Sequence, residues 1–160
     1  MSSLSLTRNR LEAWVSFLRA HAAITRQLNA DLLNAHDLTL SDYEVLLRLS
    51  NAENQMMRRV DLAESVLLTA SGITRLLDGL ERAGYVEKAS CSSDARVSYA
   101  KLTASGRRKL NEAAATHLAG IDELFTSRFE ASELETLAVL LTRLPLTAHD
   151  CGGGEHCSPQ

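Results

Sequence analysis

Hydrophobic residues recur every three or four positions over most of the chain, which is the spacing of one face of a helix. The pattern predicts a long first helix over Arg8 to His36, with a stripe of Leu11, Trp14, Leu18, Ala22, Thr25, Leu28 and Leu32. A second long helix is predicted over Ala104 to Phe129, with a stripe of Leu110, Ala114, His117, Leu118, Ile121, Leu124, Phe125 and Phe129. Both stripes are long relative to the segments left to pack on them.

Capping signals mark the starts of further helices. Ser41 and Glu44 form a capping box that predicts a helix ending near Ser50, followed by a polar loop. Thr103 is the predicted N-cap of the second long helix. Ser132 and Glu135 form another box, and the helix that follows carries Leu134, Leu137, Ala138, Leu141 and Leu144 on one face before Pro145 ends it.

The middle of the chain has a different pattern. A short helix is predicted over about Val60 to Val66, and a second runs from an N-cap at Thr69 to Gly84, a typical C′ glycine. Two alternating segments follow, Tyr85 to Ala89 and Val97 to Leu102, with Cys91 to Asp94 as the tip between them. The order α-α-α-α-β-β-α-α describes a mainly α fold in which a helix-turn-helix is followed by a β-hairpin wing.

The front of the second short helix carries small polar residues and an arginine. Thr69, Ser71, Thr74 and Arg75 lie away from the apolar face made by Ile73, Leu76, Leu77 and Leu80. Hydroxyl groups can bond base edges or phosphates, and arginine can pair with guanine through two hydrogen bonds. In helix-turn-helix proteins this part of the second helix enters the major groove. The alternative is an ordinary solvated helix face.

The hairpin resembles the wing of the MarR family of bacterial multiple-antibiotic-resistance regulators. Asp94, Arg96, Leu102 and Thr103 match the family pattern Asp-x-Arg-x5-Leu-Thr, and Leu62-Ala63, Thr74-Arg75, Leu80-Glu81, Gly84 and Gly106-Arg107 also sit where that family has such residues. The resemblance extends from about Leu11 to Leu146 and implies a dimeric winged helix-turn-helix transcription factor. It also implies that Arg96 enters the minor groove and that Asp94 holds it or its neighbours in place. Ala95 replaces a residue that is often basic, so we expect weaker backbone binding by this wing.

The net charge of −3 hides an uneven distribution. From Arg58 to Lys109 there are ten Lys or Arg against six Asp or Glu, a net charge of +4. The rest of the chain has seven against fourteen, a net charge of −7. Basic charge is therefore concentrated where phosphates would be met, and we assign Arg108 to phosphate contact. Chance clustering of a few charges is the alternative.

The predicted division of the chain is 1–40 as an N-terminal dimerisation helix, 41–103 as the winged-helix region, 104–147 as C-terminal dimerisation helices and 148–160 as a tail. Apolar stripes left uncovered at both ends are most simply buried against a second copy about a two-fold axis, giving an intertwined dimer. Such a homodimer would bind a pseudo-palindrome in double-stranded DNA. The alternative is a monomer that buries the same stripes internally.

Trp14, His21 and Tyr43 are candidates for a small-molecule site. MarR-family members commonly bind small aromatic acids in a cleft between the dimer base and the winged-helix region. Pockets combine apolar walls with a few polar groups, as these three residues would. The alternative is that Trp14 and Tyr43 belong to the core and that His21 is an interface histidine.

The tail holds His149, Cys151, His156 and Cys157 around three glycines. Thiolates and imidazoles are good zinc ligands, so zinc is a possible cofactor there, and no other cofactor is predicted. The spacing matches no standard zinc motif, and disorder is the alternative. Cys91, alone on the wing tip, is open to reversible oxidation, although a single surface cysteine is usually incidental.

These features together predict a regulator rather than an enzyme, since no catalytic motif or phosphate-binding glycine loop is evident. We expect this regulator to be a repressor. We also expect it to be cytoplasmic, because no apolar run approaches the roughly 18 residues of a membrane span and no signal peptide is evident. A small aromatic or phenolic ligand would release it from DNA. The alternative is a redox- or metal-responsive regulator that uses the cysteines and histidines of the tail.

Overall fold

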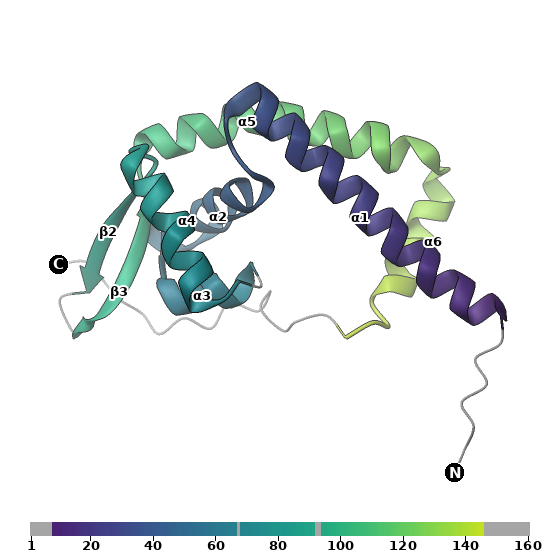
Figure 1. Cartoon of the computed structure of the whole chain (residues 1–160), viewed down its shortest axis with the longest axis horizontal. Coiled ribbons are helices and arrows are strands. Elements are labelled where there is room, and N and C mark those ends of the chain that lie inside the picture. The colour runs from purple at the N-terminus through teal and green to yellow at the C-terminus, as the bar shows by residue number, and fades with distance from the viewer. Residues whose placement is uncertain (1–7, 67, 92–93, 146–160) are drawn as a thin grey trace, which may run out of the picture.

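A computed structural model of the chain describes residues 8–66, 68–91 and 94–145, and it is mainly helical with one small antiparallel sheet (Figure 1). Its elements in chain order are α1 (Arg8–His36), α2 (Leu40–Asn51), the 3-10 helix η1 (Glu53–Gln55), β1 (Met56–Arg58), α3 (Arg59–Ser65), α4 (Ala70–Arg82), β2 (Val86–Cys91), β3 (Asp94–Leu102), α5 (Ala104–Leu124), the 3-10 helix η2 (Thr126–Arg128) and α6 (Ala131–Leu141). The predicted fold, a mainly α chain with a β-hairpin wing, is confirmed.

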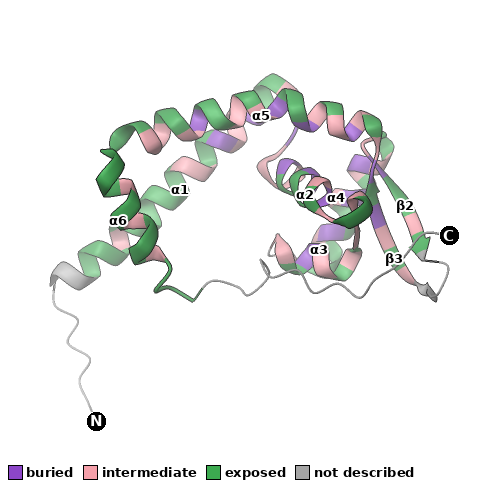
Figure 2. Cartoon of the chain, turned by 180° about the vertical axis from the view of Figure 1, so that it is seen from behind, coloured by how far each residue is buried: buried purple, intermediate pink, exposed green. Residues whose placement is uncertain are grey.

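One hydrophobic core joins α2, α3, α4 and the sheet to α5. Its fully buried side chains include Leu46, Leu49, Leu62 and Leu77, which come from three different helices. Burying a leucine side chain contributes about 1.5–3 kcal/mol, so this cluster is the main source of stability for the winged-helix region. Figure 2 shows the buried segments gathered here and where α1 meets α5.

The turn from α4 into the wing is fixed by backbone geometry. The hydroxyl of Thr69 caps α4 by accepting a hydrogen bond from the Gly72 amide at 3.1 Å. At the other end, Gly84 has a φ of +76°, a conformation that glycine adopts without strain. The Tyr85 amide then donates to the Leu80 carbonyl at 2.9 Å, which closes the helix end. Both predicted boundaries of this helix are confirmed.

The wing is anchored at its base by Thr103. Its hydroxyl donates to the Gly84 carbonyl at 2.6 Å and accepts from the Gly106 amide at 3.0 Å, so it caps α5 and holds the end of α4 at once. Strand order in the sheet is β1-β3-β2, with Val86 paired to Leu102. A register irregularity between Ser90 and Cys91 marks the strand near the wing tip.

Helix α5 runs from the base of the wing towards α6, and α1 packs across it (Figure 1). The two helices come so close that a Cβ atom on Gly120 would lie 2.7 Å from Cδ2 of Leu28. His36 Nε2 lies 2.7 Å from the Thr116 hydroxyl, a second link between α1 and α5. Among the described residues, no helix combines the length and apolar character needed to cross a bilayer.

Several predicted helix boundaries were wrong. Helix α2 is capped by Thr39 with Asp42, two residues before the predicted box, and α6 is capped by Glu130 with Glu133. Helix α5 ends at Leu124 and not near Phe129, because η2 interrupts it, and α6 ends at Leu141, before Pro145.

The sheet also differs from the prediction. The wing strands run to Cys91 and start again at Asp94, where the tip was expected. Strand β1, between the predicted polar loop and the first short helix, was not predicted; it pairs with β3, so the sheet has three strands among the described residues.

Candidate nucleic-acid interface

The N-terminal half of α4 presents its polar residues to solvent. Thr69, Ser71, Thr74 and Arg75 are all exposed, whereas Ile73 on the opposite side is 3% exposed. The amphipathic spacing read from the sequence therefore gives one buried and one free face. All four residues predicted for base reading come from a single helical segment. The opposite side of that segment packs on the core through Ile73.

Local hydrogen bonds leave this face able to bind further groups. Thr74 donates its hydroxyl proton to the Ala70 carbonyl at 2.8 Å, so its oxygen lone pairs can still accept a hydrogen bond. The hydroxyl oxygens of Thr69 and Ser71 lie 3.2 Å apart. In the described part of the chain, no side chain or carbonyl pairs with Arg75. Its guanidinium is the strongest free donor on the helix.

Further basic residues flank the helix. Arg108 is exposed near the start of α5, whereas its neighbour Arg107 reaches the Ser50 carbonyl at 3.5 Å. Near the end of α4, Arg82 donates through Nε to the Asp78 carbonyl at 3.2 Å. A shallow hollow beside it is lined by Asp78, Glu81 and Arg82. Two carboxylates in the hollow would repel a phosphate group. The hollow therefore separates the basic residues near the start of α4 from those near the start of α5.

The wing places the family motif at its tip. Asp94 and Arg96 open strand β3, but their side chains lie outside what the structure describes. Their proposed roles in DNA binding therefore stay predictions. Lower on the wing, Lys101 and Glu87 are 3.8 Å apart on neighbouring strands, both largely exposed.

The three residues predicted to bind a small molecule do not come together within one chain. Trp14 and His21 are exposed on the N-terminal half of α1, and the ring of Trp14 lies 6.4 Å from that of Phe17 between centroids. Tyr43 is 4% exposed and belongs to the core, as the alternative predicted. Trp14, which the alternative also placed in the core, is 56% exposed in the single chain.

Tyr43 does contact an ionisable residue that the sequence analysis assigned only to an apolar stripe. The rings of Tyr43 and His117 lie 4.4 Å apart, tilted by 41°, where α2 packs on α5. His117 Nδ1 is buried with no hydrogen-bond partner among the described residues. Burial lowers the pKa of His117 and raises the pKa of Tyr43, because removal from water disfavours the charged form of each. Both groups are therefore held neutral at this junction.

The predicted zinc ligands His149, Cys151, His156 and Cys157 lie outside the described residues. Within residues 8–66, 68–91 and 94–145, no cluster of three or more His, Cys, Asp or Glu side chains is arranged to hold a metal ion. The metal-binding tail stays a prediction from sequence.

Known proteins share this fold and sequence pattern. The sequence model of the MarR family matches residues 38–98. An HTH-type transcriptional regulator from Bacillus cereus is 30% identical over 120 residues, which cover 75% of this chain and 78% of the relative. AbsC, a MarR family transcriptional regulator from Streptomyces coelicolor, is 30% identical with a TM-score of 0.81, covering 88% of this chain and 95% of that one.

A solved structure of a mutant MarR from Escherichia coli complexed with operator DNA is also similar. Its identity is 25% and its TM-score 0.73, and the match covers 89% of this chain and 98% of that chain. Relatives of this kind are regulators and not enzymes, as the sequence indicated. The chain belongs to the MarR family of winged helix-turn-helix transcriptional regulators.

Proposed function

We propose that this protein is a transcriptional repressor that binds a pseudo-palindromic operator as a homodimer. The observation that carries the proposal is the exposed front of α4, where Arg75 and three hydroxyl side chains are free to meet base edges. The net charge of +4 between Arg58 and Lys109 supplies attraction to phosphates. The similar MarR complex with operator DNA supports the same use of the fold.

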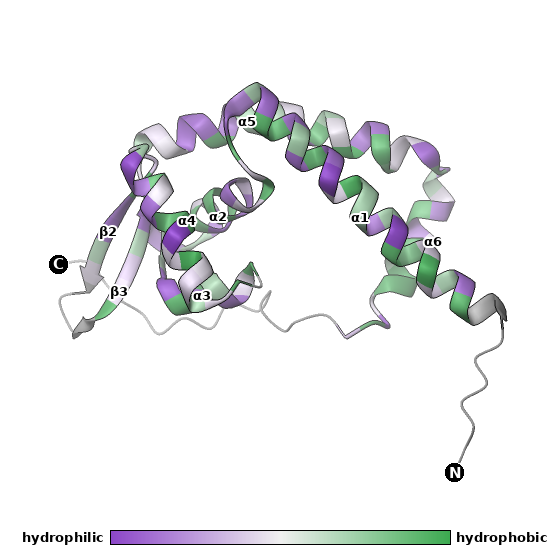
Figure 3. Cartoon of the chain, viewed as in Figure 1, coloured by the Kyte–Doolittle hydropathy of each residue, from purple (hydrophilic) through white to green (hydrophobic). Residues whose placement is uncertain are grey.

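The homodimer is supported by apolar surface that one chain leaves uncovered. On α1, Trp14 is 56% and Phe17 44% exposed, and on α6, Val139 is 61% and Leu140 45% exposed. Figure 3 shows hydrophobic segments along these same two helices, away from the winged-helix region. A second copy related by a two-fold axis would cover both stripes with their own counterparts. We propose residues 1–40 and 104–147 for this interface and residues 41–103 for DNA.

Regulation by a small aromatic or phenolic acid completes the proposal. The winged-helix region is joined to α5 and α1, which also carry the proposed dimer surface. A ligand that changes how these helices cross would change the separation of the two α4 helices and thus the fit to successive major grooves. The exposed aromatic and imidazole groups of α1, Trp14 and His21, are the proposed contacts.

Selection of duplexes from a random-sequence pool tests the proposal directly. The bound duplexes should converge on two inverted half-sites about one helical turn apart. Affinity for a selected duplex should exceed that for its scrambled version, and log K should fall linearly with log salt concentration. A reporter gene with that site across its promoter should be repressed. A pool that shows no enrichment, or an enriched site without two-fold symmetry, would contradict the proposal.

A further inference from the structure

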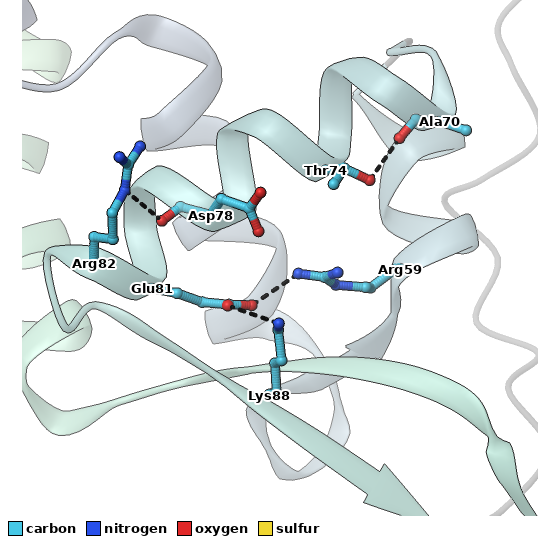
Figure 4. Close-up of polar contacts among 7 residues, drawn as sticks. All are labelled: Arg59, Ala70, Thr74, Asp78, Glu81, Arg82 and Lys88. Carbon is cyan, nitrogen blue, oxygen red and sulfur yellow. Dashed lines mark hydrogen bonds and ion pairs between the residues drawn. The ribbon is translucent and has the colours of Figure 1, made fainter.

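Glu81 bonds two cationic side chains from two other elements. Its Oε1 accepts a hydrogen bond from Arg59 Nη2 at 2.8 Å, and its Oε2 lies 3.6 Å from Lys88 Nζ. Glu81 belongs to the last turn of α4, Arg59 opens α3, and Lys88 is on strand β2 of the wing. Figure 4 shows both cations pointing at the one carboxylate. Three parts of the winged-helix region therefore meet at a single side chain.

The pair between Glu81 and Arg59 is largely removed from water. Their side chains are 18% and 19% exposed, whereas Lys88 is 65% exposed. Arg59 Nε is buried with no hydrogen-bond partner among the described residues, so Glu81 is what compensates this guanidinium. Charges in a half-buried site interact more strongly than on the surface, and removing one partner leaves the other uncompensated. The bond from Glu81 to Arg59 on α3 is thus shorter and better shielded from water than the ion pair from Glu81 to Lys88 on the wing.

The place of Glu81 on α4 relates it to base reading. Seven residues separate it from Thr74, which is two helical turns, so both lie on the same side of the helix. Glu81 fixes this side of α4 against α3 and the wing near the C-terminal end, while the N-terminal end carries the proposed base contacts. A small change in the direction of α4 at its C-terminal end would therefore move Arg75 near its N-terminal end.

We propose that Glu81 is a positioning residue for DNA recognition, holding the C-terminal turn of α4 in place against α3 through Arg59 and against the wing through Lys88. The inference rests on the proposed function, since it needs base reading by α4. Contacts to base edges require a set geometry, whereas phosphate attraction tolerates displacement. Loss of Glu81 therefore acts on specific binding and not on general attraction to DNA.

Loss of the Glu81 charge and loss of positioning change DNA affinity in opposite directions, so the two effects can be told apart. A carboxylate near DNA repels phosphate, so its neutralisation alone raises affinity for every duplex. Loss of positioning lowers affinity for the selected duplex alone. In a Glu81→Gln protein we expect the ratio of affinities, selected duplex over scrambled duplex, to fall about tenfold, which is about 1.4 kcal/mol. Affinity for the scrambled duplex should stay the same or rise.

Glu87→Gln is the matched control. It also removes one negative charge, but among the described residues Glu87 pairs with Lys101 on the neighbouring strand and with no other cation. This variant should raise affinity for both duplexes alike and leave their ratio unchanged. Binding is measured for wild type and variants at several salt concentrations, well below each melting temperature. Equal ratios in the Glu81→Gln and Glu87→Gln proteins would overturn the proposal.

A second variant keeps the test decisive if Glu81→Gln does not fold. Glu81→Asp keeps the charge, but its side chain is one methylene shorter and cannot hold both cations where they lie. It should lose part of the affinity ratio at unchanged net charge, and a folded Glu81→Asp protein with the wild-type ratio would overturn the proposal. If the wild type itself enriches no sequence from the random pool, the proposed function fails and not the role of Glu81.

Discussion

Arg75 is an exposed arginine in the N-terminal half of α4, and in the described part of the chain nothing holds its guanidinium. Arg75→Ala removes no packing from the core, so the protein should fold as before. If the side chain pairs with a guanine, the change should cost about 1–3 kcal/mol per half-site and relax the base preference there. Titration of the selected duplex and of duplexes substituted at single positions measures both effects.

Arg108→Ala is the control for that measurement. Arg108 is also exposed but lies on α5, outside the recognition helix. As a phosphate contact it should weaken selected and scrambled duplexes alike and reduce the salt slope by about one. Equal losses on both duplexes for Arg75→Ala would mean that Arg75 reads no base.

His117 gives stability a dependence on pH. Its pKa is lowered in the folded chain by burial, so between that value and the ordinary pKa of about 6.5 the unfolded chain binds the proton more readily. Stability is therefore retained above pH 6.5 and lost as the pH falls below it, by at most about 1.4 kcal/mol per pH unit for one group. The cause is burial of the ring, whose Nδ1 has no hydrogen-bond partner among the described residues.

Urea unfolding between pH 7.5 and pH 5 measures this dependence. His117→Leu should flatten the fall in unfolding free energy over that range. A His117→Leu protein that loses stability with pH as steeply as wild type would place the responsible group elsewhere.

Gly106 shows how closely elements approach at the base of the wing. A Cβ atom there would lie 2.1 Å from the Tyr85 carbonyl oxygen, and a backbone atom cannot move aside alone. Gly106→Ala should therefore destabilise the protein by about 1–3 kcal/mol despite its better helix propensity. The midpoint of thermal unfolding reports the change.

Gly79 supplies the opposite case in another helix. Nothing lies within 4 Å of a Cβ atom at this position, which is inside α4. Gly79→Ala should stabilise the protein by up to about 1 kcal/mol, because alanine favours the helix without meeting a neighbour. If both glycine variants shift stability in the same direction, contact with Tyr85 does not decide the effect at Gly106.

Periodic segments were predictable from sequence and their exact starts were not. The span of α1 and the N-caps Thr69 and Thr103 follow from apolar spacing and one hydroxyl each. At α2, both Thr39 and Ser41 precede an acidic residue by three positions, so local chemistry allows either box. Tertiary burial decides, because a cap at Thr39 puts Leu38 and Tyr43 at the two staple positions, and both are core residues.

The interactions between elements were less predictable. Strand β1 is three residues long and exists through its pairing with β3, more than forty residues later. Glu81 and Arg59 are 22 positions apart, and no periodicity links them. The exposed face of α4 was predictable because one helix carries it. The charge cluster at the C-terminal end of α4 depends on three elements meeting, which a local pattern does not encode.

At the scale of the whole molecule, the uncovered stripes on α1 and α6 predict a homodimer. Trp14 is 56% exposed in the single chain and lies on the proposed interface. Trp14→Glu would place a charge there and should shift the protein towards monomer. Sedimentation at micromolar concentration should give a dimer for wild type, with a melting temperature that rises with concentration. Glu87→Gln, exposed on the wing and outside the proposed interface, serves as the control. A stable wild-type monomer would contradict the dimer.

Control by a small molecule also belongs to the assembled protein. Trp14 and His21 lie on the half of α1 that the dimer would cover, while Tyr43 lies in the core where α2 meets α5. Since Tyr43 is buried in the core, the proposed ligand would contact Trp14 and His21, where the partner's helices approach. The dimer would exist in two states that differ in the separation of the two winged-helix regions. Such a ligand shifts the equilibrium between these states only by the difference in its affinity for them.

We therefore expect a small aromatic or phenolic acid to lower operator affinity, and operator DNA to lower affinity for that acid by the same factor, because coupling between two sites is reciprocal. Titration of such compounds into the protein–duplex complex, and of duplex into the protein–ligand complex, measures the two factors. Trp14→Ala and His21→Ala should each weaken the response, whereas Tyr43→Ala would truncate a core side chain and does not test the site. Release in wild type with the same response in both α1 variants would place the site elsewhere. If these acids have no effect but an oxidant or zinc releases DNA, regulation falls instead to the cysteines and histidines at 149–157.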